Sequence, residues 1–503
     1  MKKEYLAPPA PSSLLTSLRS IGYSIETAVA DLVDNSISAE ASHICIEFVK
    51  NEDNSFVSIS DDGIGMTEEE LFNAMKIGYM NPNADRNIND LGRFGMGLKT
   101  ASFSQCKSLT VISKSNNSHV SCMRWDLDYL NDSSNNEWAI LPTPSKNAEN
   151  LISLLESKNH GTIVIWDKLD RLLPLDSTDQ NLLDIIDKVE RHLAITFQRY
   201  IDGIFGAKKV EIKINRKKIK SIDPFMSSNS FTQNSPEEQI KTKSGYVKIQ
   251  EHILPFIDNL SDREIQWIGW DQNMNSLQGF YIYRNNRLLV EGSWLGLGIP
   301  KAWTKEEAYK LARISIDITN SSDYDWKIDI MKSKASAPIG RLREILTGIG
   351  ARARCKSRQV FAYRGCSHRI KSEKDDFVPV WVPFKDSKNH TFYKINKSHP
   401  LIETIKSRIN DKELFNSLLN CIESSVPVRE IWVNSASGED APVVANSEEF
   451  SKELINSLEL VLGIIMKNGD ISLDEAMEKV KNIAPFNDYQ DLLSNYIEGK
   501  KNG

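Results

Sequence analysis

The sequence predicts an α/β fold spread over more than one domain, and three observations support this prediction. The chain has 503 residues, too many for one hydrophobic core, so about two to four domains are expected. Its first 215 residues alternate strand-like and helix-like segments, and a second group of strand-like runs follows. Helical periodicity then dominates after residue 446. The domains we expect cover residues 1–215, 216–350, 351–445 and 446–503.

In the first region, the expected elements alternate in a regular order. We expect helices at 24–40, 67–77 and 182–204, and strands at 43–50, 55–60, 107–113, 120–125 and 161–166. A loop rich in Asn, Asp and Gly covers 78–97.

Later elements are a linker or loop at 221–235, strands at 246–250, 265–269, 279–284 and 311–318, a helix at 338–353, a hairpin within 375–395, and two amphipathic helices after 447.

Composition restricts the class of protein. Hydrophobic residues make up 40% and charged residues 26%, which is ordinary for a globular protein in water. The net charge of -6 argues against attraction of the whole surface to nucleic acid or acidic membranes, although a local basic patch stays compatible with it. The six cysteines are scattered and the longest apolar run, near 458–466, is too short to cross a membrane. We therefore expect a cytoplasmic protein with reduced thiols.

The first candidate site lies on a helix. Asp31 and Asn35 are four residues apart in ETAVADLVDNSISA, so they share one helix face, whereas Glu26 faces elsewhere. An amide oxygen is a hard ligand for Mg²⁺, and a carboxylate one turn away can polarise a water molecule beside a phosphate. The alternative is an ordinary solvated helix face.

The second candidate site is a strand that ends at a glycine turn, VSISDDGIGMT. Asp61 stands at the strand end, where its carboxylate can accept a hydrogen bond from an exocyclic amino group such as adenine N6. Gly65 allows the backbone to approach a flat ligand, and Met66 is placed to lie against a base. The alternative is a plain turn into a helix, with Thr67 as its N-cap and Glu70 completing a capping box.

The third candidate site is the glycine-rich run GRFGMGLKTAS. It contains Gly92, Gly95 and Gly97, followed by Lys99 at the start of a helical stretch. Free amides at a helix N-terminus favour anions, and a lysine adds positive charge. The glycine spacing differs from the dinucleotide and P-loop motifs, so a flexible loop is the alternative.

These three stretches, in this order and spacing, resemble the ATP-binding domain of the gyrase, heat-shock-chaperone, histidine-kinase and MutL (GHKL) superfamily. A fourth element is GTIVIW, where Thr162 matches the threonine that supports the adenine-binding aspartate. The resemblance covers about residues 15–210. It implies a Bergerat-type ATP-binding α/β sandwich, followed by a transducer-like α+β domain and a partly helical C-terminal region.

The resemblance also implies the ligands, ATP and Mg²⁺, and the role of each residue. Asn35 corresponds to the Mg²⁺ ligand, and Asp31 stands where most of these ATPases have a glutamate as general base. Because aspartate is shorter by one methylene, we expect slow hydrolysis. The loop 78–97 resembles the ATP lid. The remaining nucleotide contacts are expected from Asp61, Gly65, Met66, Gly92, Gly95, Gly97, Lys99 and Thr162.

A second lysine belongs to this set. YDWKIDIMKSK, at 324–334, resembles the transducer strand of MutL and its relatives, in which a lysine reaches the γ-phosphate. The match places Lys332 in that role, with Lys334 as the alternative. The alternative is that this lysine is simply exposed at a strand end and has no contact with ATP.

Two further segments indicate the subfamily. YRNNRLL and the IDPF sequence at 222–225 most resemble MORC-type ATPases, including bacterial relatives linked with restriction and phage defence. This resemblance implies a homodimer that forms with ATP, action on DNA, and other defence or DNA-processing proteins as partners. The competing functions are a chaperone-like protein clamp and the ATPase subunit of a topoisomerase-like complex.

A basic segment supplies the candidate DNA contact. Residues 341–371 hold nine Lys or Arg and one acid. Such a stripe on an acidic protein can contact DNA phosphates, and it can equally be a solvated helix face or an intersubunit contact. The residues chosen as DNA ligands are Arg352, Arg354, Lys356 and Arg358.

Overall fold

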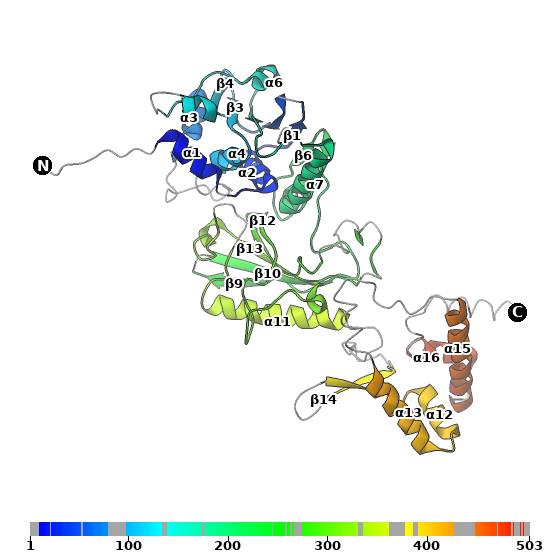
Figure 1. The fold of residues 1–503 in the computed structure, drawn as a ribbon. Helices are drawn as coiled ribbons and strands as arrows, with labels where there is room; N and C mark the ends of the chain where they lie inside the picture. The colour runs from blue at the N-terminus through cyan, green and yellow to red at the C-terminus, as the bar shows by residue number, and fades with distance from the viewer. Residues whose placement is uncertain are drawn as a thin grey trace.

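The computed structural model shows two sheets that are followed by a helical C-terminal part (Figure 1). It describes residues 10–483 together with Phe486, Leu493 and Tyr496, apart from gaps at 21, 52–53, 79–96, 133–137, 174–176, 244, 257–258, 262–263, 266–273, 330–334, 362–377, 386–390, 427–447 and 470.

The first sheet has seven strands in the order β4-β3-β5-β2-β1-β6-β7. Neighbouring strands are antiparallel except for β1 and β6, which are parallel. The strands are β1 (His43–Val49), β2 (Phe56–Asp61), β3 (Ser108–Lys114), β4 (Ser121–Asp126), β5 (Gly161–Asp167), β6 (Glu211–Ile214) and β7 (Lys217–Lys218). All the strands predicted in this region are present, and the predicted α/β class is confirmed.

Helices pack against this sheet because each presents an apolar stripe to it. In α2 the buried stripe includes Val29, Leu32 and Val33, which join the strands in one core. The helix α3 begins at a capping box, in which the side chains of Thr67 and Glu70 each accept a hydrogen bond from the other's backbone NH. The helices are α1 (Pro11–Arg19), α2 (Ile25–Ser38), α3 (Glu68–Met75), α4 (Gly97–Gln105), α5 (Leu127–Asp132), α6 (Lys146–Glu156), α7 (Asp179–Thr196) and α8 (Gln198–Asp202).

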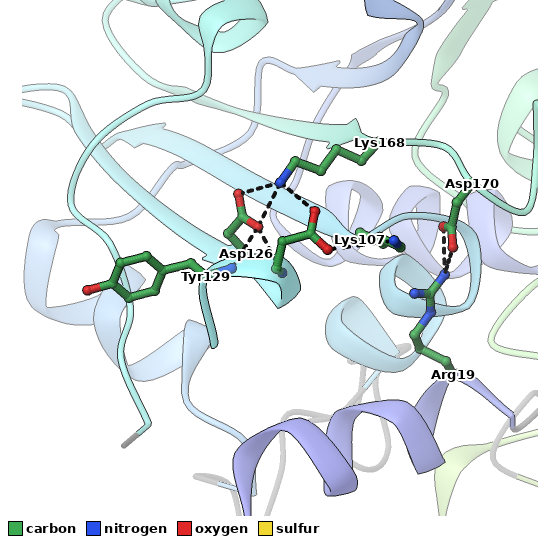
Figure 2. Close-up of polar contacts among 7 residues, drawn as sticks. Arg19, Lys107, Asp126, Tyr129, Lys168 and Asp170 are labelled. Atoms are coloured by element: carbon green, nitrogen blue, oxygen red, sulfur yellow. Dashed lines mark hydrogen bonds and ion pairs between the residues drawn. The ribbon is translucent and has the colours of Figure 1, made fainter. Parts of the chain in front are cut away.

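Ion pairs connect α1, β4 and α5 with the turn after β5 at one end of the first sheet (Figure 2). Arg19, at the end of α1, donates to both carboxylate oxygens of Asp170 at 2.6 and 2.8 Å. Beside this pair, Lys168 bridges Asp126 and Asp128, at 2.9 and 2.8 Å. These contacts join α1, β4 and α5 to the turn after β5, which leaves the opposite end of the strands for the candidate site.

The second sheet has six strands, with β12-β11-β13-β10-β8 in order and β9 paired to β10. The helix α11 covers one face, where Leu346, Ile349 and Ala353 join the second core. The elements are β8 (Gln233–Asn234), β9 (Glu238–Thr242), β10 (Gly245–Ile253), β11 (Gly279–Arg284), β12 (Arg287–Ser293), η3 (Glu307–Tyr309), β13 (Ala312–Ile318), η4 (Asn320–Ser322) and α11 (Arg341–Phe361).

The two sheets share apolar side chains. Tyr281, Tyr283 and Leu288, on the strands β11 and β12, belong to the core of the first sheet. Phe225 also joins that core, and its ring stacks on His252 of β10 with 4.3 Å between centroids. The first part of the predicted linker at 221–235 is packed, because Ile222 and Phe225 are buried, whereas most of residues 227–235 are exposed.

Three predicted elements differ from the structure in other ways. The helix expected at 182–204 is divided, since α7 ends at Thr196 and α8 begins at Gln198. The helix expected at 338–353 continues to Phe361. Of the strand expected at 265–269, Ile265 is helical and the other positions lie outside the described residues.

The C-terminal part, drawn in yellow to red in Figure 1, has two small hydrophobic clusters of its own. The hairpin predicted within 375–395 and the two helices predicted after 447 are present. The elements are β14 (Trp381–Lys385), β15 (Thr391–Ile395), α12 (Pro400–Arg408), α13 (Lys412–Ser425), α15 (Glu448–Gly469) and α16 (Leu473–Val480). Within the described part of the chain, none of the helices combines the length and apolarity that a membrane crossing requires.

The first core offers a test of the fold. Trp166 on β5 is fully buried and donates its indole NH to Ser102 Oγ at 2.8 Å. We expect Trp166→Ala to lower the free energy of unfolding by about 3–5 kcal/mol, because it leaves a cavity and an unpaired hydroxyl. Chemical denaturation measures this loss. Tyr324→Ala is the control, since that ring is 87% exposed and its removal leaves the stability unchanged.

Candidate nucleotide-binding site

Three neighbouring strands bring polar side chains together at one end of the first sheet. Asp61 on β2 lies opposite Thr162 on β5, and Thr162 lies opposite Ser113 on β3. The hydroxyl groups of Ser113 and Thr162 are 2.8 Å apart and hydrogen bonded. The end of the strands therefore carries a connected polar row inside an otherwise apolar sheet.

The carboxylate of Asp61 is held from two sides. Ser36 on α2 donates its hydroxyl to Oδ2 at 2.8 Å, and the backbone NH of Gly63 donates to Oδ1 at 2.9 Å. The side chain is buried, which raises the pKa of Asp61, while these hydrogen bonds act in the opposite direction. An ionised carboxylate accepts about four hydrogen bonds, so it retains capacity for a ligand's amino group.

The turn after Asp61 lies directly against the neighbouring strands. Gly65 has φ 67°, and a β-carbon there would lie 1.8 Å from the carbonyl oxygen of Lys114. No other residue fits that position. The next residue, Met66, donates its NH to Ser113 Oγ at 2.9 Å and is only partly buried. The turn is thus fixed on the polar row, with the Met66 side chain beside it.

The other two motifs meet at α2. Asp31 is 3% exposed, and the hydroxyl of Tyr23 donates to its Oδ2 at 2.9 Å. Asn35, one turn later, is exposed. A β-carbon at Gly97, the first residue of α4, would lie 3.6 Å from Asp31 Oδ2. The start of the predicted phosphate-binding helix therefore lies against the predicted general base.

Lys99 has a different environment from the one expected. Its side chain is 3% exposed, and Nζ donates to the carbonyl oxygens of Ala74 and Lys76 at 2.8 and 2.9 Å. Burial lowers the pKa of Lys99 to about 8. In this arrangement the ammonium group holds the C-terminal end of α3, so its predicted contact with phosphate stays a prediction.

Several predicted residues lie outside the described part of the chain. These are Gly92, Gly95, Lys332, the alternative Lys334, and residues 79–96 of the predicted lid.

The sequence analysis missed the groups that orient the site. Ser36 was not among the residues expected at the site, yet its hydroxyl donates to Asp61. Tyr23 precedes the helix and gave no signal. Arg287, from the YRNNRLL segment, donates its Nε to both oxygens of Asp34, each at 2.8 Å. The unusual RNNR turn was the available signal for this contact.

The basic segment on α11 is largely occupied by contacts within the chain. Arg352 and Lys356 both pair with Glu251, whose side chain is 2% exposed. Arg354 is buried, with its guanidinium over the rings of three aromatic residues at 3.5, 5.1 and 5.2 Å from their centroids. Arg358 is exposed. These intramolecular contacts do not favour the four residues as one DNA-binding patch.

The geometry agrees with comparisons with known proteins. Residues 23–162 match the family model described as histidine kinase-, DNA gyrase B-, and HSP90-like ATPase. This range contains all the described residues of the candidate site named above except Arg287. Residues 23–162 therefore match an ATPase domain of the GHKL class, which confirms the resemblance predicted from the motifs.

Within that class the chain is similar to MORC ATPases. It is 33% identical to ATPase morc-1 of Caenorhabditis elegans over 88 residues, which are 18% of this chain and 10% of that protein. It is 28% identical to ATPase MORC2B of Mus musculus over 125 residues, 24% of this chain and 12% of the relative. The chain thus matches about a tenth of the length of these relatives.

The turn can be tested at Gly65. We expect Gly65→Ala to abolish binding of a fluorescent ATP analogue, because the methyl group collides with the backbone of β3. Gly206→Ala is the matched control, since Gly206 also has positive φ, 77°, but no atom lies within 4 Å of its added β-carbon. Equal binding by the two variants would show that the turn geometry does not matter for the ligand.

Lys99 makes stability depend on pH. The pKa of Lys99 is lowered to about 8 in the folded protein, so above that pH the folded protein loses this proton while the unfolded chain still keeps it. The wild type should therefore gain stability relative to Lys99→Met as pH rises from about 8 toward the ordinary lysine value. Urea denaturation across this range measures the difference, and a constant difference would contradict the buried ammonium.

Proposed function

We propose that this chain binds ATP with Mg²⁺ at the site formed by α2, the β2–α3 turn and the start of α4, and hydrolyses it slowly to change the arrangement of its two sheets. The observation that carries the proposal is the Asp61 carboxylate, oriented by Ser36 and Gly63 in line with Thr162. It occurs within a domain of the ATPase class.

The residues present suit both ligands. Asp61 would accept the adenine amino group, while Gly65 lets the turn lie against β3 and Met66 would contact the base. The exposed amide of Asn35 offers a hard oxygen to Mg²⁺, which supplies positive charge beside the phosphates. The N-terminus of α4 at Gly97 offers free amides to the phosphates. Gly92, Gly95, Lys99 and Lys332 would complete the phosphate contacts.

Asp31 would act as the general base. Its Oδ2 is held by the hydroxyl of Tyr23, whose pKa is raised by burial and by the charge of Asp31. Tyr23 therefore stays protonated and keeps donating, which fixes the carboxylate beside Gly97. The carboxylate is one methylene shorter than a glutamate would be, and a longer path to the attacking water gives a slow reaction.

The resemblance to MORC ATPases extends the proposal to a homodimer that forms with ATP and acts on DNA, in restriction or phage defence. We also propose domain boundaries near residues 215, 350 and 445; β7 of the first sheet (Lys217–Lys218) lies just past the first of these, and α11 (Arg341–Phe361) continues across the second. Stimulation of hydrolysis by DNA supports the DNA role. Stimulation by an unfolded client protein, without any effect of DNA, supports the chaperone-like alternative.

Asp31 gives the decisive test. We expect Asp31→Asn to bind ATP as the wild type does and to lose about 10²–10⁴-fold in kcat, the usual contribution of a general base. Asp61→Asn should lose nucleotide binding itself. Asp62→Asn is the control, because that neighbouring carboxylate binds the backbone NH groups of Ser42 and His43 at 2.7 and 2.8 Å and faces no predicted ligand group. Wild-type hydrolysis by Asp31→Asn would exclude the assigned base.

A further inference from the structure

An arginine from the second sheet makes ion pairs with α2, the helix that carries part of the candidate site. Arg287 is the first residue of β12, and its Nε lies 2.8 Å from both carboxylate oxygens of Asp34. Its Nη2 lies 3.9 Å from Oδ1 of Asp31. Arg287 is 3% and Asp34 0% exposed, so these charges are removed from water.

The hairpin that carries Arg287 is itself fixed to the ATPase domain. Asn285 and Asn286 form its turn, with φ 48° and 67°, the left-handed conformation of a tight hairpin. Tyr200 on α8 donates its hydroxyl to the carbonyl oxygen of Asn285 at 2.7 Å. Arg287 therefore links the position of the β11–β12 hairpin to that of α2.

The position of Asp34 gives this contact its importance. Asp31 and Asp34 are neighbours across one turn of α2, and Asn35 follows directly. His192 of α7 also lies in this region, and burial together with the charge of Arg287 lowers its pKa to about 4. His192 is therefore neutral near pH 7, and Arg287 is the cation that reaches these two carboxylates among the described ion pairs.

We infer that Arg287 is a positioning residue that makes hydrolysis depend on how the second sheet is docked. It holds Asp34, and with it the turn of α2 that carries Asp31, in the geometry needed for attack. When the hairpin moves away, the buried carboxylates lose their counter-charge and the base loses its position. The inference rests on the proposed function, because it takes Asp31 as the base.

The test compares two buried arginines of one hairpin. Arg284, near Arg287, makes an ion pair with Asp323 at 2.7 and 2.8 Å inside the second sheet, away from α2. We expect Arg287→Gln to lower kcat by about 10²-fold, the effect of misplacing a reacting group, with KM and analogue binding little changed. Arg284→Gln should lose stability but keep kcat.

Two more variants separate positioning from folding. Arg287→Lys should recover part of kcat, because it returns the charge without the fork of the guanidinium. Asp34→Asn keeps the size of the side chain and should reproduce the low kcat. Combined with Arg287→Gln it should add nothing, since both changes remove one interaction.

The opposite results would overturn the inference. Equal loss of kcat in Arg287→Gln and Arg284→Gln, in proportion to lost stability, would assign Arg287 to folding alone. Additive effects of Asp34→Asn and Arg287→Gln would separate the two residues. Asp31→Asn is measured in parallel. If this variant hydrolyses ATP like the wild type, the proposed base is wrong. If only Arg287→Gln hydrolyses ATP normally, the proposed function stands and only the dependence of hydrolysis on the docking of the second sheet is wrong.

Discussion

The candidate site depends on one buried carboxylate, Asp61, whose orientation is set by hydrogen bonds at the end of a strand. Burial alone would favour its neutral form, and the hydrogen bonds from Ser36 and Gly63 oppose that tendency. Those two donors come from a helix and a turn, so the helix, the turn and three strands must all be correctly placed for the carboxylate to accept from a ligand. The requirement for glycine at position 65 follows from the same crowding, because the turn has to lie on the backbone of β3.

The part of the site that the sequence revealed is the part made by local geometry. Asp31 and Asn35 share a helix face whatever surrounds them, and a glycine turn after a strand places Asp61 at the strand end. What it did not reveal depends on distant partners. Arg287 meets Asp34 from far along the chain, and only the packing of one sheet on the other domain brings them together. Ser36 shows the limit of periodicity, since a position facing the sheet can be a hydrogen-bond donor as well as a packing residue.

The basic segment of residues 341–371 is a second case in which contacts with distant residues could not be predicted from the local sequence. Its charge count is correct, but a count does not reveal that Arg352 and Lys356 both make ion pairs with Glu251, on a strand about a hundred residues earlier. A buried carboxylate that binds two cations makes a structural cluster. Arg354 is used in a similar way, as a flat side chain against aromatic rings, where its stacking contributes to the second core.

The shared core has a practical consequence for dissecting the molecule. Tyr281, Tyr283 and Phe225 complete the interior of the first sheet although they come after residue 215. A fragment that ends at residue 215 would expose apolar surface to solvent and associate through it. A fragment extended through β13 would keep the aromatic side chains that cover this surface. Because the two sheets share this interior, we expect them to unfold together in a single calorimetric transition.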